Sequence, residues 1–241
     1  MNIQNKVVLI TGAGGGIGKA LTTVFSRNGA RLALNCHSAE NASKLKKEFP
    51  QAIIIPADIS KFTQLKSLVE KTLEHYGRID ILINNAAIYP RLEFQDCDEE
   101  SWTRIMDTNL KSIFFLSQHA AREMLKQKSG VIINISSEAG FNPKRNKGIV
   151  YHLSKSGVNF LTESLSFILA PEIKVNAIAP GRTDTPMALF YNKPELKKKV
   201  ELEIPSGRVN TPEDIAKLAL LIISKDFTGK IIRINGGAYS L

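Results

Sequence analysis

Near its start the chain reads Val7-Val8-Leu9-Ile10-Thr11-Gly12-Ala13-Gly14-Gly15-Gly16-Ile17-Gly18. The apolar run predicts a buried strand, and the amphipathic pattern after it predicts a helix. Glycines between the two allow a tight turn and let a ligand approach the backbone closely. The helix N-terminus then offers unpaired N–H groups to negative charge. In this context the glycines predict a dinucleotide-binding turn rather than an ordinary loop.

The same alternation of short apolar runs and longer amphipathic stretches continues along the chain, and it predicts right-handed βαβ crossovers. The fold class is therefore α/β, a single doubly wound Rossmann-type domain over residues 1–241, with a seven-stranded parallel sheet and helices on both faces. Strands are predicted at Val7–Ile10, Leu32–Leu34, Ile53–Ile55, Ile81–Ile83, Val131–Ile135, Val175–Ala179 and Ile231–Ile234. Helices are predicted at Ile17–Asn28, Ala39–Phe49, Phe62–Tyr76, Glu99–Lys126, Tyr151–Leu169 and Pro212–Ile223.

One segment, between Pro180 and Thr211, interrupts this alternation. Within it, Asn192–Lys199 has a charged helical pattern that does not belong to the sheet. Ligands of doubly wound folds bind beyond the carboxyl ends of the strands, so an insertion around residues 186–208 would cover the substrate. A solvent-exposed excursion is the alternative.

Composition narrows the class of protein. No apolar run reaches the roughly 20 residues that span a bilayer, and the start lacks the apolar region of a secretion signal, so a cytoplasmic protein without membrane contact is expected. The 32 Lys+Arg exceed the 23 Asp+Glu, which favours acidic partners. No nucleic-acid-binding pattern accompanies the charge, so no nucleic acid is expected. Cys36 and Cys97 form no ligand cluster, which predicts reduced thiols and no metal site.

The chemistry is predicted to reside in Tyr151 and Lys155. An unperturbed tyrosine has a pKa of about 10, too high for proton transfer near neutrality. If residues 151–169 are helical, the Lys155 ammonium lies one turn away and lowers the pKa of the phenol. Tyr151 then becomes a usable general acid or base. The alternative for Tyr151 is a half-buried packing residue.

The end of the second predicted strand bears on the choice between NAD and NADP. An Asp or Glu there would bind the adenosine ribose and repel a 2′-phosphate. Cys36 occupies that place, while His37, Ser38 and Lys44 could meet the phosphate. NADP(H) is therefore favoured, with NAD(H) as the alternative because Gly15 supplies no basic side chain from the turn.

Five motifs in a fixed order resemble the short-chain dehydrogenase/reductases. They are Thr-Gly-x-x-x-Gly-Ile-Gly at 11–18, Asn84-Asn85-Ala86-Ala87, Asn109, Ser136-Ser137 and Tyr151-x-x-x-Lys155. Within that family the later stretches look most like the 3-oxoacyl-[acyl-carrier-protein] reductase group. These stretches are Val175–Gly181, Ile204–Arg208, Thr211–Ala216 and Asn235–Gly237.

The resemblance implies a role for each matching residue. As the catalytic set, Ser137 rather than Ser136 would bind the substrate carbonyl, Tyr151 would transfer the proton, Lys155 would also bind the nicotinamide ribose, and Asn109 would hold a relay water. His152 would point off the catalytic face. The cofactor would contact Gly12, Gly14, Gly15, Gly16, Ile17, Gly18, His37, Ser38, Asp58, Ile59, Asn85, Ala86, Tyr151, Lys155, Pro180, Gly181, Thr183 and Thr185.

The resemblance also implies a homotetramer or dimer, with the helices of Asn109 and Tyr151 at one interface and Ala238–Leu241 near another. The first hypothesis for function is an NADP(H)-dependent carbonyl reductase for small-molecule or carrier-bound substrates, with 3-oxoacyl chains on acyl carrier protein as a candidate. Lys128 and the loop Lys144–Lys147 could then steer the acidic carrier. The alternatives are a dehydrogenase or reductase for a small alcohol, sugar, steroid or pterin, and a cofactor-binding protein without turnover.

Overall fold

A seven-stranded parallel sheet forms the centre of the computed structural model, which describes residues 3–141 and 147–238. The strand order is β3-β2-β1-β4-β5-β6-β7, and every pairing is parallel. This confirms the predicted fold class and each predicted strand. The strands are β1 Val7–Ile10, β2 Arg31–Cys36, β3 Ile53–Pro56, β4 Ile81–Asn84, β5 Gly130–Ile135, β6 Ile173–Pro180 and β7 Ile231–Ile234.

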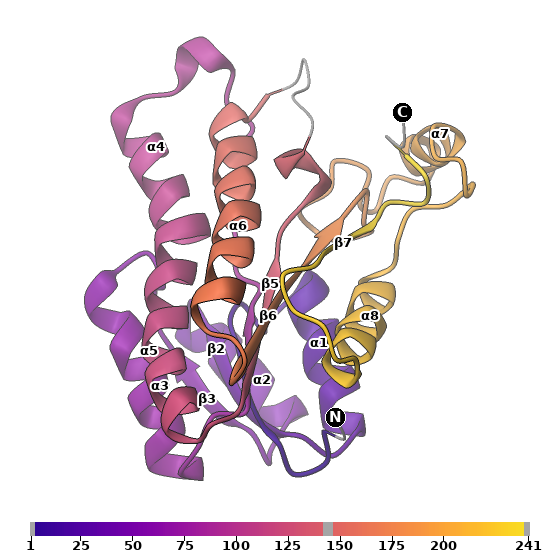
Figure 1. Ribbon diagram of the computed structural model, residues 1–241. Helices are drawn as coiled ribbons and strands as arrows, with labels where there is room; N and C mark the ends of the chain where they lie inside the picture. Colours follow the sequence, from indigo (N-terminus) through magenta and orange to yellow (C-terminus); the bar gives the residue numbers. More distant parts are fainter. Residues whose placement is uncertain (1–2, 142–146, 239–241) are drawn as a thin grey trace.

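Helices cover both faces of the sheet, with α3, α5 and α6 on one face and α1, α2 and α8 on the other (Figure 1). No helix in the described part of the chain is both long and apolar enough to cross a membrane. The helices are α1 Gly16–Arg27, α2 Ala39–Glu48, α3 Phe62–Tyr76, α4 Glu99–Met106, α5 Ser112–Lys126, α6 Ile149–Ile168, α7 Pro194–Leu202 and α8 Pro212–Ser224.

The predicted long helix Glu99–Lys126 differs from the observed structure in one respect. A π-helical segment, Asp107–Lys111, separates α4 from α5. Such segments widen one turn of a helix and are frequent at functional sites. The segment contains Asn109, whose side chain reaches a neighbouring loop rather than its own helix.

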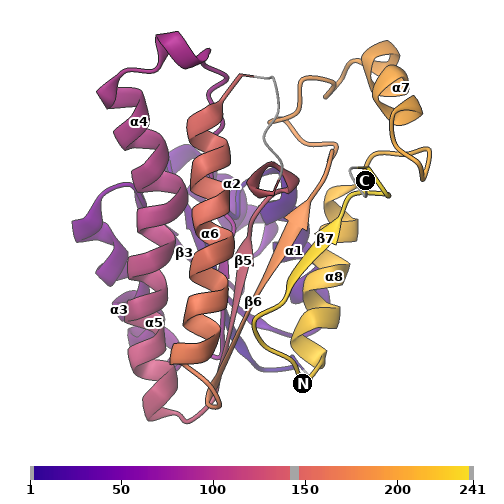
Figure 2. The same ribbon diagram turned by 45° about the horizontal axis from the view of Figure 1, so that its top comes forward.

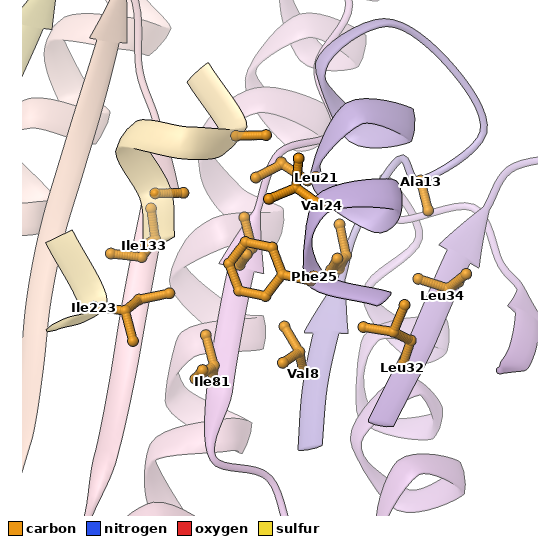
Figure 3. Close-up of a cluster of buried hydrophobic side chains, with 14 of the residues drawn as sticks. Val8, Ala13, Leu21, Val24, Phe25, Leu32, Leu34, Ile81, Ile133 and Ile223 are labelled. Atoms are coloured by element: carbon orange, nitrogen blue, oxygen red, sulfur yellow. The ribbon is translucent and has the colours of Figure 1, made fainter. Parts of the chain in front are cut away.

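Alternate residues of each strand belong to two different hydrophobic cores, because successive side chains point to opposite faces of the sheet. Val8 and Ile10 pack under α1 and α8, whereas Leu9 between them packs under α3 and α5. Figure 3 shows the first of these cores, where Phe25 of α1 lies against Val8. Burial of this kind fixes the strand register, and therefore fixes where each strand ends.

The strand order reverses between β1 and β4, since the chain first builds outward to β3 and then returns to the other side of β1. Doubly wound folds bind ligands at this switch point, beyond the carboxyl ends of the strands. Turned by 45°, the molecule shows α7 standing clear of the sheet on the side where α6 begins (Figure 2). The insertion predicted after β6 therefore lies at the ligand-binding end.

Candidate active site

A cavity of about 1310 Å³ lies at the carboxyl ends of the strands. Pockets for drug-sized ligands are typically about 300–1,000 Å³, so this one has room for a dinucleotide and a substrate together. Most of the predicted site residues line it; Gly14, Gly18, Ser38 and Asn109 do not. The predicted residues in its wall are Gly12, Gly15, Gly16, Ile17, His37, Asp58, Ile59, Asn85, Ala86, Ser137, Tyr151, Lys155, Pro180, Gly181, Thr183 and Thr185.

Asn85 holds the glycine turn in shape. Its side-chain amide donates to the backbone oxygens of Thr11 and Gly12, at 2.9 and 3.1 Å. The Thr11 hydroxyl in turn accepts from the backbone N–H groups of Asn85 and Ala86. The turn after β1 and the loop after β4 are thus joined at the switch point, which leaves the start of α1 facing the cavity.

Gly18 does not touch the cavity, but it allows the turn to close. A Cβ added there would lie 2.0 Å from the backbone oxygen of Gly12, so the first turn of α1 would have to move. At Gly15 a Cβ would meet nothing within 4 Å. The start of α1 therefore packs closely on the glycine turn, as the third glycine of a dinucleotide-binding turn allows, while the space beside Gly15 is open.

Replacing Gly18 with alanine is expected to weaken NADPH binding about tenfold and to destabilise the fold by about 2 kcal/mol, because the turn and helix can no longer pack. Cofactor fluorescence titration and thermal unfolding measure the two effects. Gly15→Ala is the matched control, with little change expected in either. Equal behaviour of the two variants would contradict this role for Gly18.

At the adenosine end, His37 alone among the predicted phosphate contacts lines the cavity. Ser38 caps α2 by accepting from the Asn41 backbone, and the Lys44 ammonium pairs with Glu40 at 2.6 Å. Burial raises the pKa of the Cys36 thiol, which is only 2% exposed. The basic residue available for a 2′-phosphate is therefore His37.

Ser137, Tyr151 and Lys155 lie together in the cavity wall. Ser137 ends the loop after β5, while Tyr151 and Lys155 share one face of α6 because they are four residues apart. The Lys155 Nζ atom donates to the Ile135 backbone oxygen at 2.7 Å and lies 5.8 Å from the centre of the Tyr151 ring. Ser136, also in the wall, is already bonded to Asn159 of α6, which leaves Ser137 for a ligand.

The pKa of Tyr151 differs from the expectation that Lys155 lowers it. Burial raises the pKa of Tyr151 to about 12, and the hydrogen bond with Ser137 offsets this only in part. Burial also lowers the pKa of Lys155 to about 8. In this arrangement the cation is too distant and too desolvated to govern the phenol, which stays protonated at neutral pH.

Asn109 lies behind the catalytic wall rather than in it. Its side-chain oxygen accepts from the Ile88 backbone N–H at 2.9 Å, while its nitrogen donates to the Ile88 oxygen and to Ser154 of α6. The π-helical turn thus ties the loop after β4 to the helix that carries Tyr151. This geometry positions the loop whether or not Asn109 also orders a water.

Three residues that the sequence did not single out, Tyr89, Arg91 and Arg104, also line the cavity, as does His152. Tyr89 stacks on Tyr151 with ring centres 4.2 Å apart, and the Arg91 guanidinium lies 4.6 Å from the centre of the Tyr89 ring. The expectation that His152 points away from the site is wrong, since His152 is 9% exposed and in the cavity wall. No spacing rule identifies Tyr89 and Arg91; they reach the wall because the loop after β4 packs against α6.

The insertion contributes a second wall of the cavity through residues 186–190 and Glu203. Two ion pairs hold α7 near the end of β6: Arg182 with Glu203 at 2.9 Å, and Lys197 with Asp184 at 2.6 Å. Of the charged helical pattern predicted at Asn192–Lys199, residues 194–199 are confirmed as part of α7, whereas Asn192 and Lys193 precede it. The segment therefore borders the cavity.

The residues expected to steer an acidic carrier are placed differently. Lys128 precedes β5 and so lies at the opposite edge of the sheet from the cavity, which corrects that expectation. Lys147 pairs with Glu93 at 2.9 Å. Lys144, Arg145 and residues 239–241 lie outside the described residues.

Comparison with known proteins defines the class. Residues 6–195 match the short chain dehydrogenase family. The chain belongs to the short-chain dehydrogenase/reductases and is an NAD(P)-dependent oxidoreductase. The resemblance found in the sequence is thereby confirmed.

Particular relatives are similar along nearly their whole length. The chain is 38% identical to a 3-oxoacyl-[acyl-carrier-protein] reductase of Thermotoga maritima, over 98% of this chain and 99% of the relative. It is 36% identical to a 3alpha-hydroxysteroid dehydrogenase of Mediterraneibacter gnavus, over 100% of this chain and 99% of the relative. A solved short-chain type dehydrogenase/reductase from Mycobacterium marinum has a TM-score of 0.92 at 30% identity, covering 100% of this chain and 98% of that one.

Proposed function

We propose that the protein reduces a carbonyl to a hydroxyl with NADP(H), using Tyr151 as the general acid. The observation that carries this is the meeting of Ser137, Tyr151 and Lys155 in one cavity with the glycine turn of β1. The bound nicotinamide supplies the hydride to the carbonyl carbon. The carbonyl oxygen takes its proton from the Tyr151 hydroxyl, which completes the alcohol.

The other site residues support this proton transfer. The Ser137 hydroxyl donates to the carbonyl oxygen and stabilises the negative charge that develops there. Lys155 and Arg91 place positive charge near the tyrosinate that forms, and Asn109 fixes the loop after β4. Gly12, Ile17, Asp58, Asn85 and Thr185 lie where they would hold the cofactor, and the buried glycine contacts fit its pyrophosphate.

A preference for NADP(H) over NAD(H) rests on His37. Replacing His37 with aspartate is expected to raise the Kd for NADPH about tenfold and to change the Kd for NADH far less, because a carboxylate repels the 2′-phosphate. Fluorescence titration with both cofactors measures the ratio. His75→Asp on α3, away from the cavity, is the control. An unchanged ratio in His37→Asp would remove His37 from cofactor selection.

Two substrate classes have support. The carrier-protein reductase among the relatives favours a 3-oxoacyl substrate of fatty acid biosynthesis, with acyl carrier protein as the partner. The hydroxysteroid dehydrogenase favours a small alcohol or ketone. The apolar wall formed by Met187, Leu189 and Phe190 suits either.

The deciding experiment is oxidation of NADPH and NADH against a carbonyl panel that includes an acetoacetyl thioester, on acyl carrier protein and as a free thioester. Turnover of any carbonyl with NADPH supports the proposed reaction. Cofactor binding without turnover of any carbonyl or alcohol would contradict it and favour a binding protein.

The proposed setting is a cytoplasmic homo-oligomer, a tetramer or dimer. Large apolar side chains are exposed on the outer surfaces of α5 and α6, including Phe114 at 44% and Phe160 at 73%. Apolar groups of this size are common in subunit interfaces. Light scattering of the purified protein tests this assembly.

A further inference from the structure

The substrate side of the cavity carries positive charge that the protein itself does not neutralise. Arg91 and Arg104 both line the cavity there, on the loop after β4 and on α4. Within the described residues the Arg104 side chain makes no hydrogen bond or ion pair. The Arg91 guanidinium donates only to the Met187 backbone oxygen and lies over the Tyr89 ring.

The acidic residues of the cavity wall do not compensate for this charge. Glu138 forms a two-point ion pair with Arg233 of β7, at 2.7 and 2.8 Å. Glu203 pairs with Arg182 at 2.9 Å. Asp58, at the adenosine end, accepts from both the backbone N–H and the hydroxyl of Ser60. Each carboxylate is already occupied, so the two arginines remain available to a ligand.

Both arginines line the same cavity as the reacting centre, and Arg91 also contacts the apolar wall through the Met187 backbone oxygen. Arg104 and Thr108 are one turn apart and both face the cavity. Arg91 is linked through the stacked Tyr89 ring to Tyr151. Figures 1 and 2 both show α4 and α7 on opposite sides of α6. The apolar residues Met187, Leu189 and Phe190, which precede α7 in the chain, also line the cavity.

We propose that the substrate is a carbonyl compound with an apolar body and an anionic group, which Arg104 and Arg91 bind. The guanidinium fork matches a carboxylate or a phosphate with two hydrogen bonds. The apolar body lies against Met187 and Leu189, and the carbonyl reaches Ser137 and Tyr151. This inference rests on the proposed function and narrows it to anionic substrates.

Matched substrates test this assignment. Acetylbutyrate and acetylbutanol phosphate each carry a ketone and an anionic group. The methyl ester of acetylbutyrate carries a similar ketone without the anionic group. The unaltered protein is expected to show a higher kcat/KM for at least one of the anions than for the ester, and the advantage should shrink as ionic strength rises. The carboxylate and phosphate arms show which anion is preferred.

Replacing Arg104 with glutamine is expected to lower the anion-to-ester ratio of kcat/KM about tenfold, with most of the change in KM. Arg104→Lys should restore part of the ratio because it keeps the charge but not the fork. Arg27→Gln, which removes an exposed arginine of α1 outside the cavity, is the control and should leave the ratio unchanged.

The outcomes separate this inference from the proposed function. If the protein reduces the ketones but shows the same ratio before and after Arg104→Gln, the anion site is overturned and the carbonyl reductase stands. If Arg104→Gln impairs only a substrate attached to acyl carrier protein, the arginine docks the carrier and the inference is also overturned. If no carbonyl is reduced with either cofactor, the proposed function itself fails.

Discussion

Tyr151→Phe is expected to lower kcat for carbonyl reduction by about 10³-fold, since general acid catalysis by a positioned side chain typically contributes about 10²–10⁴-fold. The phenyl ring keeps the stacking on Tyr89, at 4.2 Å between ring centres, and keeps the burial of the helix face. Phenylalanine lacks the hydroxyl proton that Tyr151 donates. Steady-state kcat with NADPH and a saturating ketone measures the loss.

Two further measurements make that result specific. The Kd for NADPH should change by less than about threefold, because the glycine turn and the loop after β4 still hold the cofactor. Tyr76→Phe removes a hydroxyl that donates to the Leu32 backbone far from the cavity, and it should retain kcat. A kcat in Tyr151→Phe within tenfold of the unaltered protein would exclude Tyr151 as the proton donor.

The pKa of Tyr151 determines how the rates of reduction and oxidation depend on pH. With a pKa of about 12, the phenol is protonated throughout the neutral range and is ready to act as an acid in reduction. Oxidation of an alcohol needs the tyrosinate, which burial disfavours. We therefore expect oxidation to accelerate with rising pH across the alkaline range, while reduction is nearly independent of pH around neutrality.

The fold was predictable because the hydrophobic periods of this chain are unambiguous. Val7–Ile10 is too short for a helix and is followed by glycines, so it reads as a strand. The same logic located all seven strands. It could not locate the π-helical segment Asp107–Lys111, since a single widened turn leaves the apolar pattern of α4 and α5 almost intact.

The candidate site was predictable where chemistry depends on spacing along one element. Tyr151 and Lys155 share a helix face, so their separation predicts their proximity. Tyr89 and Arg91 reach the same wall from a loop distant in sequence, and Gly148 allows the contact because a Cβ there would lie 2.4 Å from the Tyr89 ring. Neither that packing nor the burial that shifts the pKa values of Tyr151 and Lys155 can be inferred from spacing along the sequence.

Lys155 illustrates how such a site differs from an ordinary core. An ammonium that is 2% exposed has lost its water, and one backbone oxygen at 2.7 Å replaces it only in part. Burial lowers its pKa from 10.5 to about 8. One pKa unit is equivalent to about 1.4 kcal/mol, so the folded protein carries a cost of about 3 kcal/mol near neutral pH.

The pH dependence follows from the same shift. Between pH 8 and 10.5 the unfolded chain binds the Lys155 proton and the folded chain releases it, so stability rises with pH over that window. The pKa of Tyr151 is shifted upward, from 10.0 to about 12. The stability that this shift contributes is fully present below pH 10 and is lost as pH rises towards 12. For these two groups alone, stability should therefore be greatest near pH 10.

Lys155→Met is expected to stabilise the protein while it abolishes turnover. The thioether fills similar space without a charge, and losing the bond to Ile135 costs about 1 kcal/mol, so the net gain at neutral pH is about 2 kcal/mol, or a rise in Tm of about 4–8 °C. The kcat should fall by at least about 10²-fold, because the tyrosinate loses the nearby Lys155 ammonium.

Thermal unfolding across pH distinguishes the electrostatic origin of that gain from better packing. Relief of a buried charge predicts that the Tm advantage of Lys155→Met shrinks between pH 8 and 10.5, where the native lysine loses its proton. Improved packing predicts the same advantage at every pH. Lys126→Met, at an exposed position on α5, is the control for general loss of charge. A Tm below that of the unaltered protein at pH 7 would show that Lys155 contributes to the fold, and would contradict the assignment of its burial to function.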